Sequence, residues 1–206
     1  MACVTNVQFS VLVNGSPSSF FHSAGGLRQG CPLSPLLFIL VMDSLSRLIT
    51  SHKNLNVIRG VRVSPNHILS HVLFVDDVLL FGGNTMEEWK CFHELLTLFC
   101  SATGMETSLT KSTLIAPGGN IDGRICDFFP YPVTSLENGF KYLGYTLKPD
   151  KYRKKDWMWL WEQLDKPEGG YTYHLFASLV YVYKGTTYTF YKYLFLAHLQ
   201  RKQHGC

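Results

Sequence analysis

The chain has 206 residues, of which 46% are hydrophobic and only 17% are charged, and this balance excludes an intrinsically disordered tail. A chain of this length can bury a core of its own. The net charge of +4 is compatible with a polyanionic partner such as nucleic acid, but does not by itself indicate one.

The sequence shows neither a targeting signal nor cysteines at metal-binding spacing. The N-terminal residues contain no basic segment ahead of an apolar stretch, and no window reaches the roughly 18 uninterrupted apolar residues of a membrane span. The six cysteines include no CxxC pair, which argues against a disulfide framework and a zinc site. We therefore expect an intracellular protein, nuclear or cytoplasmic, that is neither secreted nor inserted in a membrane.

The N-terminal third predicts two short strands and a helix. Residues 7–13 alternate loosely and run into Asn14-Gly15, which indicates a strand followed by a turn, and a second extended piece is expected at 19–22. After a loop rich in glycine and proline, an apolar run predicts a helix over residues 35–50. Ser34 would be its N-cap and Pro35 its first residue, where a missing N–H costs nothing.

The middle of the chain predicts a hairpin, a second helix and further strands. Residues 68–81 are two β-prone runs separated by Asp76 and Asp77, which predicts a hairpin with both aspartates near its tip. Apolar residues at spacings of three and four predict an amphipathic helix over 86–103, ended by Gly104. Short strands are expected at 112–116 and 140–147. His71, inside the hairpin run, is most simply a half-buried strand residue.

The last part of the chain has a different composition. Most of the eleven tyrosines lie between residues 171 and 193, in a stretch that fits neither the helical nor the strand period. We therefore divide the chain into residues 1–164 and a divergent aromatic-rich tail, 165–206, which we interpret as a frameshift or a mispredicted exon. The residues just before the tail form either a base-stacking basic patch or, as we favour, a solvated basic segment that enters an amphipathic helix. They are Lys148, Lys151, Arg153, Lys154, Lys155, Trp157, Trp159 and Trp161.

Two short motifs have the residue types that phosphate chemistry needs. Adjacent carboxylates such as Asp76 and Asp77 repel each other, and a divalent cation would compensate for that repulsion. The alternative is an ordinary solvated turn, because turns accept aspartate freely. In GLRQGCPLSP the glycines allow close approach of backbone to a ligand, and Arg28 and Gln29 offer planar donors. Its alternative is a plain loop leading into a helix.

Taken together and in order, these segments resemble the palm region of reverse transcriptases from plant-type non-LTR (LINE-type) retrotransposons. The resemblance covers about residues 3–164 and rests on five segments in sequence: FSVLVNG, GLRQGCPLSPLLFILVMDSLSRLI, HVLFVDDVLLF, SATGMETSLTKS and FKYLGYTL. It implies an α+β fold with a palm-type antiparallel sheet backed by helices. It also implies descent from an enzyme that extends a DNA primer on an RNA template, using dNTPs and Mg²⁺, with Mn²⁺ as a substitute.

The resemblance assigns roles to individual residues. Asp76 would be a catalytic metal ligand, with Asp77 beside it in the metal cluster. Lys111 would assist the pyrophosphate leaving group as a general acid. The residues expected to position the template strand and the incoming nucleotide are Gly26, Arg28, Gln29, Gly30 and Phe74. The residues expected to grip the primer are Phe140, Leu143 and Gly144.

The sequence also departs from the family pattern. Cys31 stands where the family usually has an aspartate. The family's other essential carboxylate lies on a strand upstream of the segment that matches Cys3, together with the fingers, and a helical thumb normally follows the palm. We therefore expect a truncated palm without fingers or an intact thumb, an incomplete metal site and no useful polymerase activity. The alternatives are a non-catalytic remnant that binds nucleic acid and a pseudogene product without function.

Overall fold

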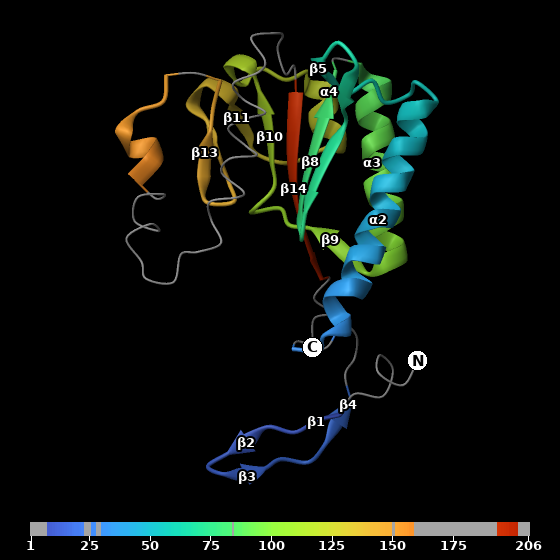
Figure 1. Cartoon of the computed structure of the whole chain (residues 1–206), viewed down its shortest axis with the longest axis vertical. Coiled ribbons are helices and arrows are strands. Elements are labelled where there is room, and N and C mark those ends of the chain that lie inside the picture. The colour runs from blue at the N-terminus through green and yellow to red at the C-terminus, as the bar shows by residue number, and fades with distance from the viewer. Residues whose placement is uncertain are drawn as a thin grey trace.

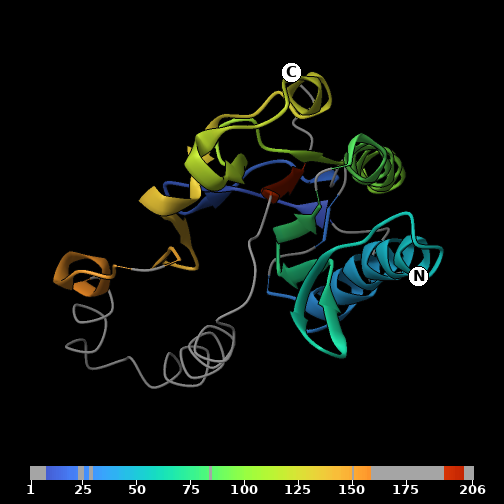
Figure 2. The same cartoon turned by 90° about the horizontal axis from the view of Figure 1, so that it is seen from above.

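Helices cover one face of a mixed β-sheet, and hairpins cover the other (Figure 1, Figure 2). The computed structural model describes residues 8–22, 26–27, 30–83, 85–149, 151–158 and 193–201. The helical layer consists of α2 (Leu33–Asn54), α3 (Met86–Thr103) and α4 (Gly123–Phe128). The expected α+β class is therefore confirmed.

The six-stranded sheet has the order β11-β10-β14-β8-β7, and β9 pairs with the far end of β14. Alternation along β8 separates two cores: Val78 and Leu80 belong to the core shared with the helices, while Leu79 and Phe81 belong to the core under the hairpins. The strands are β7 (His71–Phe74), β8 (Asp77–Gly82), β9 (Met105–Thr107), β10 (Thr113–Ala116), β11 (Val133–Ser135) and β14 (Tyr193–Arg201).

One pair of strands corrects the expectation of an antiparallel sheet. β10 and β11 are parallel, with Leu114 opposite Val133 and Ala116 opposite Ser135. Parallel neighbours need a crossover connection. Here the crossover consists of the 3₁₀ turn η1 (Pro117–Gly119) and α4, whose Ile125 packs in the helical core.

Helix α2 begins earlier than the sequence pattern predicts. Its first residue is Leu33 and its N-cap is Pro32, without a side-chain cap, so the assignment of Ser34 as N-cap is wrong. Pro35 is still tolerated because it lies in the first turn, where backbone N–H groups have no intrahelical partner. Within the described part of the chain, α2 alone is long and apolar enough to cross a membrane by length and composition. Its Met42, Leu45 and Ile49 are buried in the core.

Helix α3 has the predicted bounds, and its apolar stripe forms the centre of the core. Gly104 ends the helix in the left-handed conformation, with φ of 70°, as expected for a C-terminal glycine. Trp89 is fully buried, with its ring 5.6 Å from that of Phe92 and 5.6 Å from that of Phe129. The Trp89 indole N–H donates to the Gly83 carbonyl at 3.1 Å. This bond fixes the C-terminal end of β8 against the helix.

The predicted 68–81 hairpin is correct at its tip and wrong at its start. β7 and β8 pair around the two aspartates as expected. Residues 67–69 instead form β6 (His67–Leu69), which pairs with β5 (Val61–Ser64) in a separate hairpin. The run predicted as a strand over 140–147 is a hairpin of β12 (Phe140–Tyr142) and β13 (Tyr145–Leu147), preceded by the 3₁₀ turn η2 (Leu136–Asn138).

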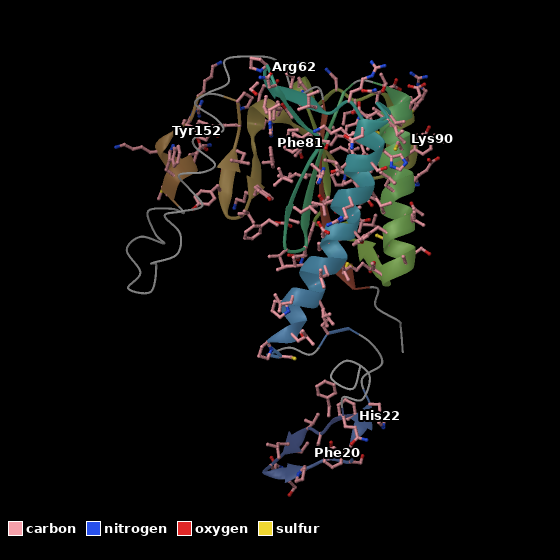
Figure 3. The ribbon with its side chains drawn as sticks, turned by 45° about the vertical axis from the view of Figure 1, so that its right-hand side comes forward. Phe20, His22, Arg62, Phe81, Lys90 and Tyr152 are labelled. Atoms are coloured by element: carbon pink, nitrogen blue, oxygen red, sulfur yellow. The ribbon has the colours of Figure 1, made fainter. Side chains whose placement is uncertain are left out.

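The N-terminal strands form an arm that extends beyond the end of α2 (Figure 1). The arm consists of β1 (Gln8–Phe9), β2 (Leu12–Val13), β3 (Ser16–Pro17) and β4 (Phe21–His22). The predicted turn at Asn14-Gly15 joins β2 to β3, and both residues have positive φ. Figure 3 shows Phe20 and His22 on this arm, away from the sheet.

β14 is the last strand in the chain, yet it lies in the middle of the sheet (Figure 1). It pairs antiparallel with β8 from Tyr193–Gly82 to His198–Asp77, and with β10 on its other side. Ala197 and Leu199 are buried in the helical core. The sequence of the tail does not predict this strand, because a short apolar run such as that over residues 193–197 does not show with which distant strands it pairs.

Candidate functional site

The Asp76–Asp77 pair lies at a tight and strained turn. Phe74 pairs with Asp77, so Val75 and Asp76 form a two-residue turn between β7 and β8. Val75 has φ of 51°, a left-handed conformation that is costly for a β-branched residue. Strain of this kind persists only where the surrounding structure imposes it, and it is concentrated at functional sites. Both carboxylates are half-buried.

The central strand β14 supports this turn from the sheet side. The Leu199 backbone N–H donates to the Asp76 carbonyl at 2.9 Å, and His198 is the register partner of Asp77. The turn is therefore held by a strand that the sequence pattern did not predict.

The side chain of Asp77 shares a face of β8 with Leu79 and Phe81, because side chains alternate along a strand. The β12–β13 hairpin covers this face, and Tyr142 packs there against Leu79 and Phe81 in the smaller core. Figure 3 shows Phe81 in the interior of the molecule. Burial and, secondarily, the negative charge of Asp77 raise the pKa of Tyr142 to about 12. Among the described residues, the buried Tyr142 hydroxyl has no hydrogen-bond partner.

The residues predicted to grip the primer lie on the same side of the sheet as Asp77. Leu143 and Gly144 form the turn between β12 and β13, with φ of 51° and 85°, and Tyr142 pairs with Tyr145. Positive φ at both central residues is typical of a type I′ turn, which matches the twist of the strands. Phe140 and Leu143 pack on the smaller core. The hairpin therefore joins the predicted grip residues to the face that carries Asp77.

Lys111 is exposed in the turn between β9 and β10. Thr107 of β9 pairs with Leu199, and Thr113 of β10 pairs with Leu196. The turn that joins β9 to β10 therefore lies level with residues 197 and 198 of β14. This places the Lys111 turn at the same end of the sheet as the aspartate turn.

The Gly/Pro-rich loop is described only in part. Gly26 and Gly30 have φ of 83° and 79°, conformations that favour glycine. Arg28 and Gln29 lie outside the described residues, so their template role stays a prediction. Phe74, at the end of β7, is 40% exposed and available for contact.

The donor chemistry of the turn fits a hard divalent cation. Magnesium is usually bound through one or two carboxylates together with water and substrate phosphates, and Asp76 and Asp77 offer two carboxylates on rigid backbone. The Tyr142 hydroxyl, buried on the sheet face that carries Asp77, is polar capacity that the described residues do not use. Over the described residues, no group of three or more His, Cys, Asp or Glu could hold a metal. The site thus fits a cation that shares its coordination with a substrate.

The basic segment is smaller than the sequence suggested. Lys148 is 8% exposed and forms a buried ion pair with Asp156, which lowers the pKa of that carboxyl. Tyr152 and Trp157 have ring centroids 5.4 Å apart. The cations that remain exposed are Lys151, Arg153, Lys154 and Lys155. Trp159 and Trp161 lie outside the described residues.

The sequence pattern does not predict that Tyr142 and the strand β14 belong to this site. For Tyr142 the available signal was the alternation of Phe140 and Tyr142 along a short strand. For β14 it was the continuous apolar run over residues 193–197. Neither signal shows which face or which neighbouring strand is involved, so only the folded arrangement reveals the contact with Asp76 and Asp77.

Comparisons with known proteins identify the relatives of the chain. Residues 2–147 match the family described as reverse transcriptase (RNA-dependent DNA polymerase). Over 67 residues, 32% of this chain and 55% of the relative, the sequence is 43% identical to an uncharacterized mitochondrial protein of Arabidopsis thaliana.

Two further relatives are retrovirus-related Pol polyproteins. The one from the type-1 retrotransposable element R2 of Popillia japonica is 26% identical over 184 residues, which is 77% of this chain and 27% of the polyprotein. The one from the type-2 element R2DM of Drosophila melanogaster is 31% identical over 147 residues, 71% of this chain and 12% of the polyprotein. The chain therefore spans about half of the plant relative and less than a third of either polyprotein. No solved structure matches the chain significantly.

Proposed function

The chain belongs to the reverse transcriptase family, and on this basis we propose that its Asp76–Asp77 turn is the cation-binding centre of a LINE-type RNA-directed DNA polymerase domain. One observation carries the proposal: a strained aspartate turn begins the strand β8, and the β12–β13 hairpin covers the face of β8 that carries Asp77. The similarity to R2 Pol polyproteins supports the LINE-type assignment.

The sheet would act as the palm of such a domain. α2 and α3 back it on one face, and the β12–β13 hairpin would meet a nucleic acid on the other face. Asp76 and Asp77 would hold Mg²⁺ or Mn²⁺, which neutralises phosphate charge when bound.

The other predicted site residues would bind the nucleic acid and the nucleotide. Phe140, Leu143 and Gly144 would position the primer end. Lys111 would donate a proton to the departing pyrophosphate. The template strand and the incoming nucleotide would contact the loop containing Gly26, Arg28, Gln29 and Gly30, together with Phe74.

We further propose that the chain by itself binds its ligands without extending a primer at a useful rate. Two cations held in line need more ligands than two adjacent carboxylates provide. Among the side chains that the structure describes, no group of three or more His, Cys, Asp or Glu could hold a metal at this turn.

A binding experiment on the full chain tests the cation-binding centre. We expect Mn²⁺ to bind with loss of its free-ion electron paramagnetic resonance signal, and an RNA–DNA primer–template to bind more tightly when Mn²⁺ is present. Asp76→Asn should weaken both effects at least tenfold. Asp127→Asn, which removes an exposed carboxylate on α4, should change neither. Equal Mn²⁺ binding by the wild type and Asp76→Asn would refute the assignment.

Primer extension tests the second part of the proposal. The wild-type chain should add no nucleotides to an RNA-templated primer with Mg²⁺ or Mn²⁺. Extension by the wild type that is lost in Asp76→Asn would overturn that expectation while supporting the site itself.

A second candidate function is binding of nucleic acid without any role for a cation. It rests on the exposed cations Lys151, Arg153, Lys154 and Lys155 beside the Tyr152–Trp157 ring pair. Binding of this kind would weaken steeply with salt and would fall in a Lys154→Ala, Lys155→Ala double variant. It would be unaffected by Asp76→Asn, which separates it from the first candidate.

A further inference from the structure

The hydroxyl of Tyr142 is an unused hydrogen-bonding group at the edge of the candidate cation site. Tyr142 is 4% exposed and its hydroxyl oxygen is buried, with no hydrogen-bond partner among the described residues. Buried polar groups are nearly always paired, and leaving one unpaired is costly. A hydroxyl in this state has the capacity to take up a further hydrogen-bond partner.

The packing limits where that partner can lie. Tyr142 belongs to one buried cluster with Val61, Leu79, Phe81 and Ile115, all apolar. Leu79 and Phe81 follow Asp77 at alternate positions of β8, so Asp77 is the next residue on the face that Tyr142 covers. The influence of the Asp77 charge on the phenol agrees with this proximity. Beyond Leu79, the next side chain on this face of β8 is therefore the Asp77 carboxylate.

We propose that Tyr142 is a positioning residue for the cation site, and that its hydroxyl donates a hydrogen bond to the Asp77 carboxylate when a divalent cation is bound. A carboxylate that binds a metal through one oxygen is normally held by a hydrogen bond to its other oxygen, and such outer partners tune metal affinity. Because Tyr142 is buried in an apolar cluster, its ring is already fixed and loses little freedom when it donates. This inference rests on the proposed function. Tyr142 is neither one of the expected metal ligands nor one of the expected primer-grip residues.

The variant Tyr142→Phe tests the inference with two measurements that should move in opposite directions. Without divalent cations, in EDTA, the variant should resist urea at least as well as the wild type, because it removes an unsatisfied hydroxyl and keeps the ring. With Mn²⁺, its affinity should fall by about 10- to 100-fold, the usual effect of losing an outer-shell partner.

The matched control is Tyr145→Phe in the same hairpin. Tyr145 pairs with Tyr142 across β12 and β13, and its pKa is raised by burial alone, without a contribution from Asp77. Its Mn²⁺ affinity should stay within about twofold of the wild type, so general loosening of the hairpin would be detected as a shared loss in both variants.

Each result has a separate meaning. Mn²⁺ affinity that is unchanged in Tyr142→Phe, or that falls equally in Tyr145→Phe, would overturn the role of Tyr142 and leave the Asp76–Asp77 site intact. Clear loss of urea resistance in EDTA would show that the hydroxyl is already paired, and would also overturn the inference. Failure of the wild type to bind Mn²⁺ would overturn the proposed function and this inference with it.

Discussion

Glu88 connects three separate backbone segments and provides the sharpest test of the fold. It lies in the first turn of α3 and is fully buried. Its Oε1 accepts the N–H groups of Arg59 and Gly60, each at 2.8 Å, and its Oε2 accepts the Gly83 N–H at 2.7 Å. One carboxylate therefore connects the start of α3, the segment before β5 and the end of β8.

Removing the carboxylate should cost several kcal/mol of stability. A hydrogen bond to a charged group contributes about 1.5–3 kcal/mol. Arg59 is exposed, so water can replace part of its bond to Glu88. The contributions of the three hydrogen bonds to stability therefore do not add in full. We expect Glu88→Ala to lower the free energy of unfolding by about 3–4 kcal/mol. Glu88→Gln should lower the free energy of unfolding by about 1–3 kcal/mol, because the NH₂ group of the new amide, itself a donor, would face the Gly83 N–H.

Urea denaturation followed by far-ultraviolet circular dichroism measures these changes, and Glu87→Ala is the matched control. Glu87 is the exposed neighbour of Glu88 in the same helical turn. Its loss should change the free energy of unfolding by no more than about 0.5 kcal/mol. If Glu88→Ala lies within about 1 kcal/mol of Glu87→Ala, the three hydrogen bonds do not stabilise the fold as argued.

Two further predictions concern acid stability and backbone crowding. Burial and the charge of Lys53 lower the pKa of His71, whose ring contacts the hydroxyls of Ser46 and Ser70 at 2.8 and 3.0 Å. The unfolded chain therefore takes up the proton first, so the free energy of unfolding should fall as pH drops through the ordinary value of 6.5 towards the lower folded-state pKa. In urea titrations at several pH values, His71→Gln should lose this decline and His67→Gln, at an exposed position, should keep it. Gly60→Ala should destabilise by about 1–3 kcal/mol in the same assay, because Gly60 has φ of 61° and an added Cβ would lie 2.5 Å from the Leu69 carbonyl oxygen. Gly123→Ala, where an added Cβ meets nothing within 4 Å, should instead stabilise by up to about 1 kcal/mol, and the opposite order of the two variants would contradict this account.

Much of the local structure follows from the order of residues. The spacing of apolar residues predicts α3 with its observed bounds, and Gly104 ends it because glycine adopts the left-handed conformation at little cost. The aspartate hairpin is likewise predicted by two β-prone runs around Asp76 and Asp77. The start of α2 is predicted less well, since the helix begins at Leu33 rather than Pro35 and the expected N-cap, Ser34, lies inside its first turn.

The ordered motifs also predict the family. The segments from FSVLVNG to FKYLGYTL fall within or at the edge of residues 2–147, the range that matches reverse transcriptases. A motif is recognised from its own residues alone, so one sequence is enough to predict the family.

Pairings between distant parts of the chain require the folded structure. The choice of β14 as the central strand depends on which of several strands has a free edge, and no local pattern records that choice. The same holds for the parallel pairing of β10 with β11, and for Tyr142, which is buried in one cluster with Leu79, Phe81 and Ile115 from distant strands. Local propensity acts over a few residues and so determines helices and turns. The neighbours of the Asp76–Asp77 turn come from strands far apart in the chain, and only burial of their shared apolar face brings them together.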